Sequence, residues 1–128
     1  MHSTKFIIVN DLKTVAQFLT CPSYSAISLD LEGQNLCRHG EIYTIQAFIP
    51  TLQSAFIFDC RKLDKSDVVD CFKRILSDSN IMKYMFDCRS DADALYHQYG
   101  LLLNNVIDIQ LYEIGLFYIL KDRTIFKY

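Results

Sequence analysis

The segment Ser25–Glu32 alternates between large aliphatic and polar residues from Ile27 onward, with Ala26 on the polar face, and this alternation constrains the fold more than any other feature of the sequence. Successive side chains of a β-strand point to opposite faces, so the aliphatic residues of the segment share one face. Asp30 and Glu32 share the other face, with their Cβ atoms ~6–7 Å apart given the rise of a strand. The segment therefore predicts a half-buried strand that presents two carboxylates side by side.

These paired carboxylates have two interpretations. Like charges on a half-buried face repel each other, and partial burial makes it harder to ionise both. A hard divalent cation such as Mg²⁺ relieves the repulsion, because such ions are held by one or two carboxylates together with substrate phosphates. Asp-x-Glu is also a common sequence, and at the end of a strand it is usually just solvated. The motif alone leaves both interpretations open.

Asp91 and Asp93 form a second acidic group, in the first turn of a predicted helix that ends at Gly100. Ser90 and Asp93 have the spacing of a capping box. Residues two apart on a helix are separated by ~200°, so the two acids cannot face one site. If Asp93 caps the helix, Asp91 is free to point elsewhere, with its ionised form favoured by the helix dipole. Acids that merely decorate a helix start are equally ordinary, and spacing alone does not place Asp91 beside Asp30.

The remaining sequence predicts an α/β domain. Runs rich in β-branched and aromatic residues predict strands at Lys5–Val9, Ser25–Glu32, Glu41–Ile49, Ser54–Asp59, Ile81–Phe86 and Val106–Asp108. Apolar residues at helical spacing predict helices over 12–21, 66–77 (capped by Ser66 or Asp67), 90–99 and 109–120. Short connections between the early strands indicate an antiparallel meander, and the later alternation of helix and strand indicates parallel strands. Together they predict one mixed β-sheet flanked by helices.

Composition narrows the classes of function. A chain of 128 residues fits one domain, and its net charge of −2 argues against a generally basic, nucleic-acid-binding surface. Affinity for nucleic acid then needs a local patch, for which Arg38, Arg89 and Lys83 are candidates, although such a residue taken alone is more often an ordinary surface charge. No apolar run is long enough to cross a membrane, and no signal peptide is evident. Five scattered cysteines are typical of reduced thiols, so we expect an intracellular protein, cytoplasmic or nuclear, without structural zinc.

Several motifs, in order along the chain, resemble those of a known family. They are Asp30-x-Glu32-Gly33-x-x-Leu36-Cys37-Arg38-His39-Gly40, Asp87-Cys88-Arg89, Asp91-x-x-Ala94-Leu95 and His97-Gln98-Tyr99-Gly100 through Asp108. This order is similar to the DEDD-type 3′–5′ exonuclease domain, the ribonuclease D-like branch of the ribonuclease H-like fold. It is most similar to the exonuclease 3′–5′ domain-containing proteins, which include piRNA-pathway and Egalitarian-like relatives. Residues 1–128 would then be the N-terminal and central part of one such domain.

The resemblance implies hydrolysis of phosphodiester bonds at 3′ ends with two metal ions, Mg²⁺ or Mn²⁺. Asp30 would bridge both ions, Glu32 would hold one and position the attacking water, and Asp91 would hold the other. Asp108 would have a supporting role beside the site. The implied substrate is a single-stranded 3′ end, with RNA favoured, and protein partners in an RNA-processing complex are expected.

Two departures from the family pattern matter. Phe86 stands where family members often carry His, and no counterpart of the third motif, with its fourth acid, precedes Tyr128. Asp122 follows Asp108 too closely to supply that acid and is interpreted as a solvated helix end. The domain therefore looks truncated at its C-terminal side. The alternative function is a catalytically incomplete RNA-binding or scaffold module of the piRNA-pathway type.

Overall fold

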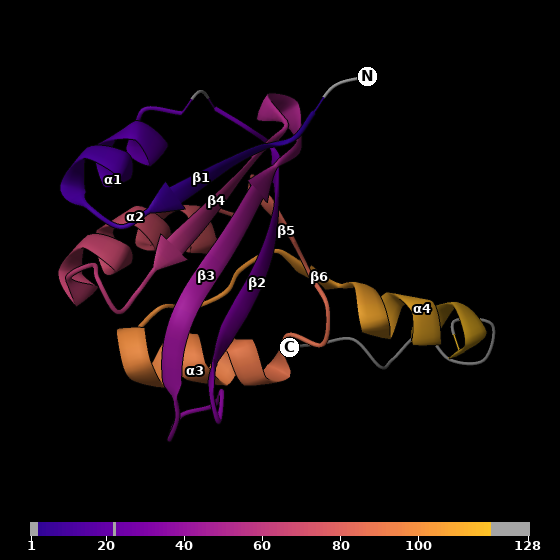
Figure 1. Cartoon of the computed structure of the whole chain (residues 1–128). Coiled ribbons are helices and arrows are strands. Elements are labelled where there is room, and N and C mark those ends of the chain that lie inside the picture. Colours follow the sequence, from indigo (N-terminus) through magenta and orange to yellow (C-terminus); the bar gives the residue numbers. More distant parts are fainter. Residues whose placement is uncertain (1–2, 22, 119–128) are drawn as a thin grey trace.

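The computed structural model describes residues 3–21 and 23–118, which form a mixed sheet with helices packed against it (Figure 1). The elements are β1 (Lys5–Val9), α1 (Leu12–Leu19), β2 (Ala26–Gln34), β3 (Glu41–Ile49), the 3₁₀ turn η1 (Pro50–Leu52), β4 (Ser54–Asp59), α2 (Lys65–Ser77), β5 (Met82–Met85), α3 (Arg89–Tyr99), β6 (Val106–Asp108) and α4 (Ile109–Tyr118).

The sheet has six strands in the order β1-β4-β3-β2-β5-β6. β2, β3 and β4 are an antiparallel meander. β1 pairs with β4 in parallel, and β5 and β6 add in parallel on the other side of β2. The predicted fold class, a meander followed by parallel strands, is therefore confirmed. β2 lies in the interior of the sheet, hydrogen-bonded on both sides, which holds its side chains in fixed directions.

The alternation in β2 is the one that the sequence predicts. Ile27, Leu29 and Leu31 are buried, whereas Asp30 and Glu32 are exposed on the opposite face. The strand runs two residues further than predicted, and its pairing with β3 shifts register directly after Glu32. This irregularity separates the regular part of the strand, with its two acids, from the hairpin that leads into β3.

An aromatic cluster holds α1 and α2 against the sheet. The ring centroid of Phe18 on α1 lies 5.0 Å from that of Phe56 and 4.9 Å from that of Phe58, both on β4. Phe72 on α2 lies 4.7 Å from Phe58. Edge-to-face packing at these distances adds to the hydrophobic gain of burying the rings. α3 instead crosses the end of the sheet where β2 and β3 form their hairpin (Figure 1).

The helices α1, α2 and α3 begin in different ways. Asp11 caps α1 by accepting a hydrogen bond from the amide of Thr14. The prediction of Ser66 or Asp67 as the cap of α2 is wrong, because the carbonyl of Asp64 already accepts the first helical hydrogen bonds. α3 begins at Arg89 and ends, as expected, at a left-handed Gly100.

α4 extends away from the sheet after β6 (Figure 1). It is described as far as Tyr118, so the last two residues of the predicted helix, 119 and 120, lie outside the described residues, as does Asp122. Among the described helices none combines the length and apolar character needed to cross a membrane.

The aromatic cluster yields a stability prediction. Phe72→Ala removes a fully buried ring and should lower the free energy of unfolding by about 3–5 kcal/mol. Phe6→Ala is the control, because Phe6 is 72% exposed, and it should cost no more than about 0.5 kcal/mol. Chemical denaturation followed by circular dichroism measures both. Equal losses for the two variants would contradict this description of the core.

Candidate active site

Asp30 and Glu32 lie on the exposed face of β2, just beyond the residues of this strand that pair with β5. Asp30 is paired with Gln46 of β3, and Glu32 with Thr44, so polar side chains flank both acids across the meander. No ion pair among the described residues engages the carboxylate of Asp30 or Glu32. Both acids are therefore available to a ligand that approaches this face.

Asp91 lies in the first turn of α3 and is buried, with only 6% of its surface exposed. Burial first, and then the negative charges of Asp30 and Glu32, together raise the pKa of its carboxyl group to about 7. Asp87 and Asp108 contribute smaller effects of the same sign. Charges act in this way only at short range inside a protein. The structure thus brings Asp91 to the acids of β2, about sixty residues earlier in the chain, which spacing alone could not establish.

The acids approach one another without forming a finished metal site. Within residues 3–21 and 23–118, no three His, Cys, Asp or Glu side chains are already grouped as metal ligands. The donor set nevertheless fits a hard divalent cation, because it consists of carboxylate oxygens whose mutual repulsion such a cation relieves. The burial of Asp91 strengthens this fit, since a buried carboxylate without a counter-charge is unfavourable.

Asp108 holds the start of α3 in place. Its carboxylate accepts hydrogen bonds of 2.9 Å from the amides of both Asp87 and Cys88, which join β5 to α3. It also accepts hydrogen bonds from the backbone amides of Gln110 and Leu111, at 3.0 and 3.4 Å, and so caps α4. Burial acts to raise the pKa of Asp108, but the hydrogen bonds from Cys88 and Asp87 outweigh it and hold the pKa below its usual value.

The junction that Asp108 binds is a bend in the backbone. Asp87 has a φ of 48°, in the left-handed region that non-glycine residues rarely adopt. Two hydrogen bonds to a buried carboxylate stabilise this conformation. The bend turns the chain from β5 into α3 and thereby directs the first turn of α3, with Asp91, toward β2.

The two arginines predicted to bind nucleic acid each form an ion pair with an aspartate. One aspartate lies on α3 and the other in the turn between β5 and α3. Nη2 of Arg38 lies 2.7 Å from Oδ1 of Asp93, and Nη2 of Arg89 lies 3.1 Å from Oδ1 of Asp87. Their side chains remain 52% and 70% exposed. Neither pairs with Asp30, Glu32 or Asp91 among the described ion pairs, so a role in binding nucleic acid stays a prediction.

Two other expectations about charged residues are wrong. Lys83 does not belong to a surface basic patch: it is fully buried on β5, and its ammonium group donates to the carbonyl of Asp78. Burial lowers the pKa of this amine. Asp93 does not cap α3, because the helix begins four residues earlier and Asp93 binds Arg38 of the β2–β3 hairpin instead.

Gln98 is a functional candidate that the sequence interpretation missed. Its side-chain amide donates to the carbonyl of Cys37 at 2.7 Å and accepts the amide of Ile42 at 3.2 Å. Gln98 follows Asp91 by seven residues, two helical turns, so both lie on one face of α3. The sequence does contain a signal for this role, because Gln98 is a polar residue on the helix face that also carries the buried Ala94 and Leu95.

One cavity is separate from Asp30, Glu32 and Asp91. It has a volume of about 710 Å³ and lies between α3, the segment 101–105, β6 and α4. Its lining is mainly apolar, with Leu101, Leu102 and Tyr112 among the contributors. Asp30, Glu32 and Asp91 do not line it, so the candidate active site is the open face around β2 rather than this cavity.

Known proteins resemble this chain along most of its length. A profile of the 3′–5′ exonuclease family matches residues 6–118. The piRNA biogenesis protein EXD1 of Xenopus laevis is 38% identical over 71% of this chain and 20% of its own length. EXD1 of Homo sapiens is 34% identical over 85% of this chain and 21% of its own length. The chain thus spans about a fifth of the curated relatives that it matches.

Solved structures share the fold. RNase D of Trypanosoma brucei in complex with GMP is 27% identical and superposes with a TM-score of 0.79, covering 88% of this chain and 36% of that one. The EXO domain of Nibbler from Aedes aegypti, at 12% identity, has a TM-score of 0.75 and covers 100% of this chain and 66% of that one. The latter likeness is one of fold alone. Both agree with the predicted ribonuclease H-like sheet.

The raised pKa of Asp91 predicts how stability depends on pH. A folded-state pKa above the unfolded value of about 4 means that stability present at lower pH is lost as the pH rises toward about 7. In chelator, Asp91→Asn should therefore raise the free energy of unfolding at about pH 8 by on the order of 2 kcal/mol, since one pKa unit corresponds to about 1.4 kcal/mol. At about pH 5 the gain should be much smaller, because the wild-type carboxyl is then protonated in the folded state.

Denaturant titration at the two pH values measures this effect. Asp70→Asn serves as the control, since Asp70 is an exposed acid on α2, and its effect should stay within about 0.5 kcal/mol. A gain for Asp91→Asn that is the same at both pH values, or a loss at the higher one, would contradict the proximity of the three acids.

Proposed function

Because this chain belongs to the 3′–5′ exonuclease family, we propose that it hydrolyses phosphodiester bonds at the 3′ ends of nucleic acid. The observation that carries this proposal is the burial of Asp91 beside the charges of Asp30 and Glu32. A domain that serves only as a scaffold gains nothing from three carboxylates that repel one another. Single-stranded RNA is the favoured substrate, which is supported by the similarity to an RNase D crystallised with RNA.

Asp30, Glu32 and Asp91 are the proposed ligands of Mg²⁺ or Mn²⁺. Asp30 would bridge two ions, Glu32 would hold one of them and Asp91 the other. Bound there, the ions would stabilise the attacking and leaving oxygens of an in-line displacement. The carboxylate of Glu32, exposed at the face of the sheet, would orient the attacking water. Asp108 acts on this site indirectly, since it holds the turn from which Asp91 projects.

Arg38 and Arg89 are the proposed contacts to substrate phosphates. A guanidinium group has five N–H donors. Arg38 directs Nε and Nη2 at Asp93, and Arg89 directs the same two atoms at Asp87, so each retains further donors. A local contact of this kind is needed because the chain as a whole carries a net charge of −2.

A second function is a non-catalytic RNA-binding or scaffold module within an RNA-processing complex. Two observations favour it. The relatives at 34–38% identity are all named as piRNA biogenesis proteins. In the described part of the chain, no three acidic, His or Cys side chains are grouped as metal ligands.

A degradation assay separates the two functions. The chain should shorten 5′-labelled single-stranded RNA from its 3′ end in Mg²⁺ or Mn²⁺ and not in chelator. Asp30→Asn should lower the rate by about a hundredfold or more, because even indirect partners of metal sites are worth 10–100-fold. Asp70→Asn, on the exposed face of α2, should leave the rate unchanged.

The scaffold function predicts the opposite pattern. RNA binding in a gel shift would then persist in chelator, with no shortened product under any metal condition. That result would overturn the nuclease proposal. Binding that disappears on chelation, together with product formation that needs Asp30, would exclude the scaffold function.

Metal binding itself gives a further prediction. Metal ligands must be deprotonated to bind, and the pKa of Asp91 is about 7. Saturating Mn²⁺ should therefore raise the melting temperature strongly at about pH 8 and only weakly at about pH 5. Asp91→Asn should reduce the shift at the higher pH. An equal Mn²⁺ effect at both pH values would show that the ion binds elsewhere.

A further inference from the structure

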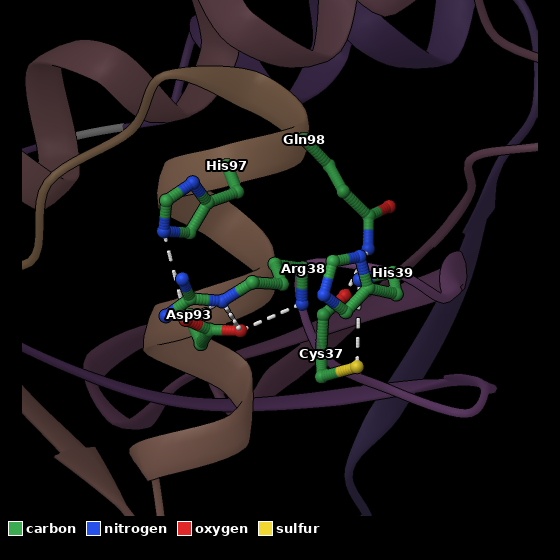
Figure 2. A network of polar contacts seen from close by, with 6 residues as sticks. All are labelled: Cys37, Arg38, His39, Asp93, His97 and Gln98. Carbon is green, nitrogen blue, oxygen red and sulfur yellow. Dashed lines mark hydrogen bonds and ion pairs between the residues drawn. The ribbon is translucent and has the colours of Figure 1, made fainter.

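A polar cluster outside the three acids connects α3 to the β2–β3 hairpin. It consists of Arg38 with Cys37 and His39 at the hairpin, and Asp93, His97 and Gln98 on α3 (Figure 2). The two sides of this cluster are separated by 55 or more residues in sequence. The proposed reaction assigns only Arg38 a role, so the remaining contacts require an explanation.

Asp93 binds both the backbone and the side chain of Arg38. Its Oδ2 accepts the backbone amide of Arg38 at 2.6 Å, and its Oδ1 accepts Nε at 3.1 Å and Nη2 at 2.7 Å. Hydrogen bonds between a guanidinium group and a carboxylate are shorter and stronger than those between neutral groups. His97 lies 3.7 Å from the same carboxylate. Because Asp93 binds the backbone amide of Arg38 as well as its guanidinium group, it fixes the backbone of the hairpin and not merely a flexible side chain.

Gln98 makes a second connection between α3 and the β2–β3 hairpin, through other partners. Its side-chain amide donates a hydrogen bond to the carbonyl of Cys37 in the loop and accepts one from the backbone amide of Ile42 at the start of β3, so it binds the loop and one strand of the hairpin. Gln98 is about 10 Å from Asp91 along the helix, at 1.5 Å per residue, and faces the same way. The two links, through Asp93 and Gln98, therefore both lie C-terminal to Asp91, on the same helix that carries it.

The hairpin transmits this attachment to the acids of β2. Glu32 is the last residue before the register shift, and the hairpin begins directly after it. A Cβ on Gly33 would overlap the carbonyl oxygen of Glu41, and one on Gly40 would overlap that of Asn35. The amide of Gly40 also donates to the carbonyl of Cys37 at 3.2 Å. Such close packing leaves the hairpin little freedom, so a displaced tip moves Glu32 with it.

We propose that Asp93 and Gln98 are positioning residues: with Arg38, they join α3 to the hairpin and so set the distance between Asp91 and the Asp30–Glu32 pair. The catalytic consequence rests on the function proposed above, but the geometric one does not. Exposed ion pairs add little to global stability. The Arg38–Asp93 pair therefore serves to align two elements that carry different ligands of one site.

Asp93→Asn and Gln98→Leu test this role, with Asp59→Asn as a matched control. Asp59 also accepts a backbone amide and pairs with an arginine, Arg61, but these partners are only two residues apart in sequence, so the pair joins no distant elements. In the metal-free protein we expect the carboxyl ¹³C resonance of Asp91 to shift in both test variants and to stay in place in Asp59→Asn. An unchanged Asp91 resonance in Asp93→Asn and Gln98→Leu would overturn the proposal.

RNA degradation provides the kinetic test. A misplaced ligand should lower kcat about tenfold or more in Asp93→Asn, since small displacements at a reacting centre are costly. KM should change less than kcat does, because the guanidinium group of Arg38 is still present to bind phosphate whereas the misplaced ligand acts on the chemical step. If Arg38 served only to bind phosphate, releasing it from Asp93 would leave kcat intact, and this result would also overturn the proposal.

A failure of the proposed nuclease function can be distinguished from a failure of the proposed positioning role. If the unmodified chain degrades no RNA, the proposed function is overturned, and the Asp91 resonance alone decides whether the cluster positions that residue. Asp93 lies at the surface, so Asp93→Asn provides the result even if Gln98→Leu does not fold. A normal melting temperature for Asp93→Asn, combined with a shifted resonance and a reduced kcat, is the expected outcome.

Discussion

The repulsion among three carboxylates, one of them buried, is the constraint around which this molecule is arranged. Burying Asp91 next to Asp30 and Glu32 is unfavourable by itself, as the raised pKa of Asp91 records. The rest of the fold has to supply the stability that this arrangement removes. The interior position of β2 and the aromatic packing of α1 and α2 do so on the opposite face of the sheet. The packed core and the candidate site thus lie on opposite faces of β2.

Elements determined by local pattern could be predicted from the sequence. The alternation around Asp30, the aromatic runs of the meander and the helical spacing of α2 each depend on residues close together in the chain. Periodicity and turn residues encode exactly such short-range information. The order of antiparallel and parallel strands followed, because connection length restricts which strands can pair. Errors were confined mainly to helix starts, such as the cap of α2.

Long-range contacts could not be predicted in this way. No local signal pairs Asp93 with Arg38 across 55 residues, and the alternative of a helix cap was chemically just as reasonable. The sequence predicts a surface position for Lys83, because lysine is rarely buried, whereas its place on β5 directs it into the core. The proximity of Asp91 to β2 likewise depends on the bend at Asp87, whose left-handed conformation has no signature in the sequence. Resemblance to a family, and not spacing, supplied that pairing in advance.

The tight hairpin after Glu32 has a consequence for how this sequence can diverge. Because a methyl group at Gly33 or Gly40 would collide with backbone oxygens, neither glycine can be replaced while the loop keeps its present length. Substitution there and insertion or deletion in the loop should therefore occur together in evolution. A homologue that retains both glycines should also retain the spacing from Glu32 to Arg38, and with it the partner of Asp93. Loop length, usually the most freely varying property of a surface connection, is here tied to two individual residues.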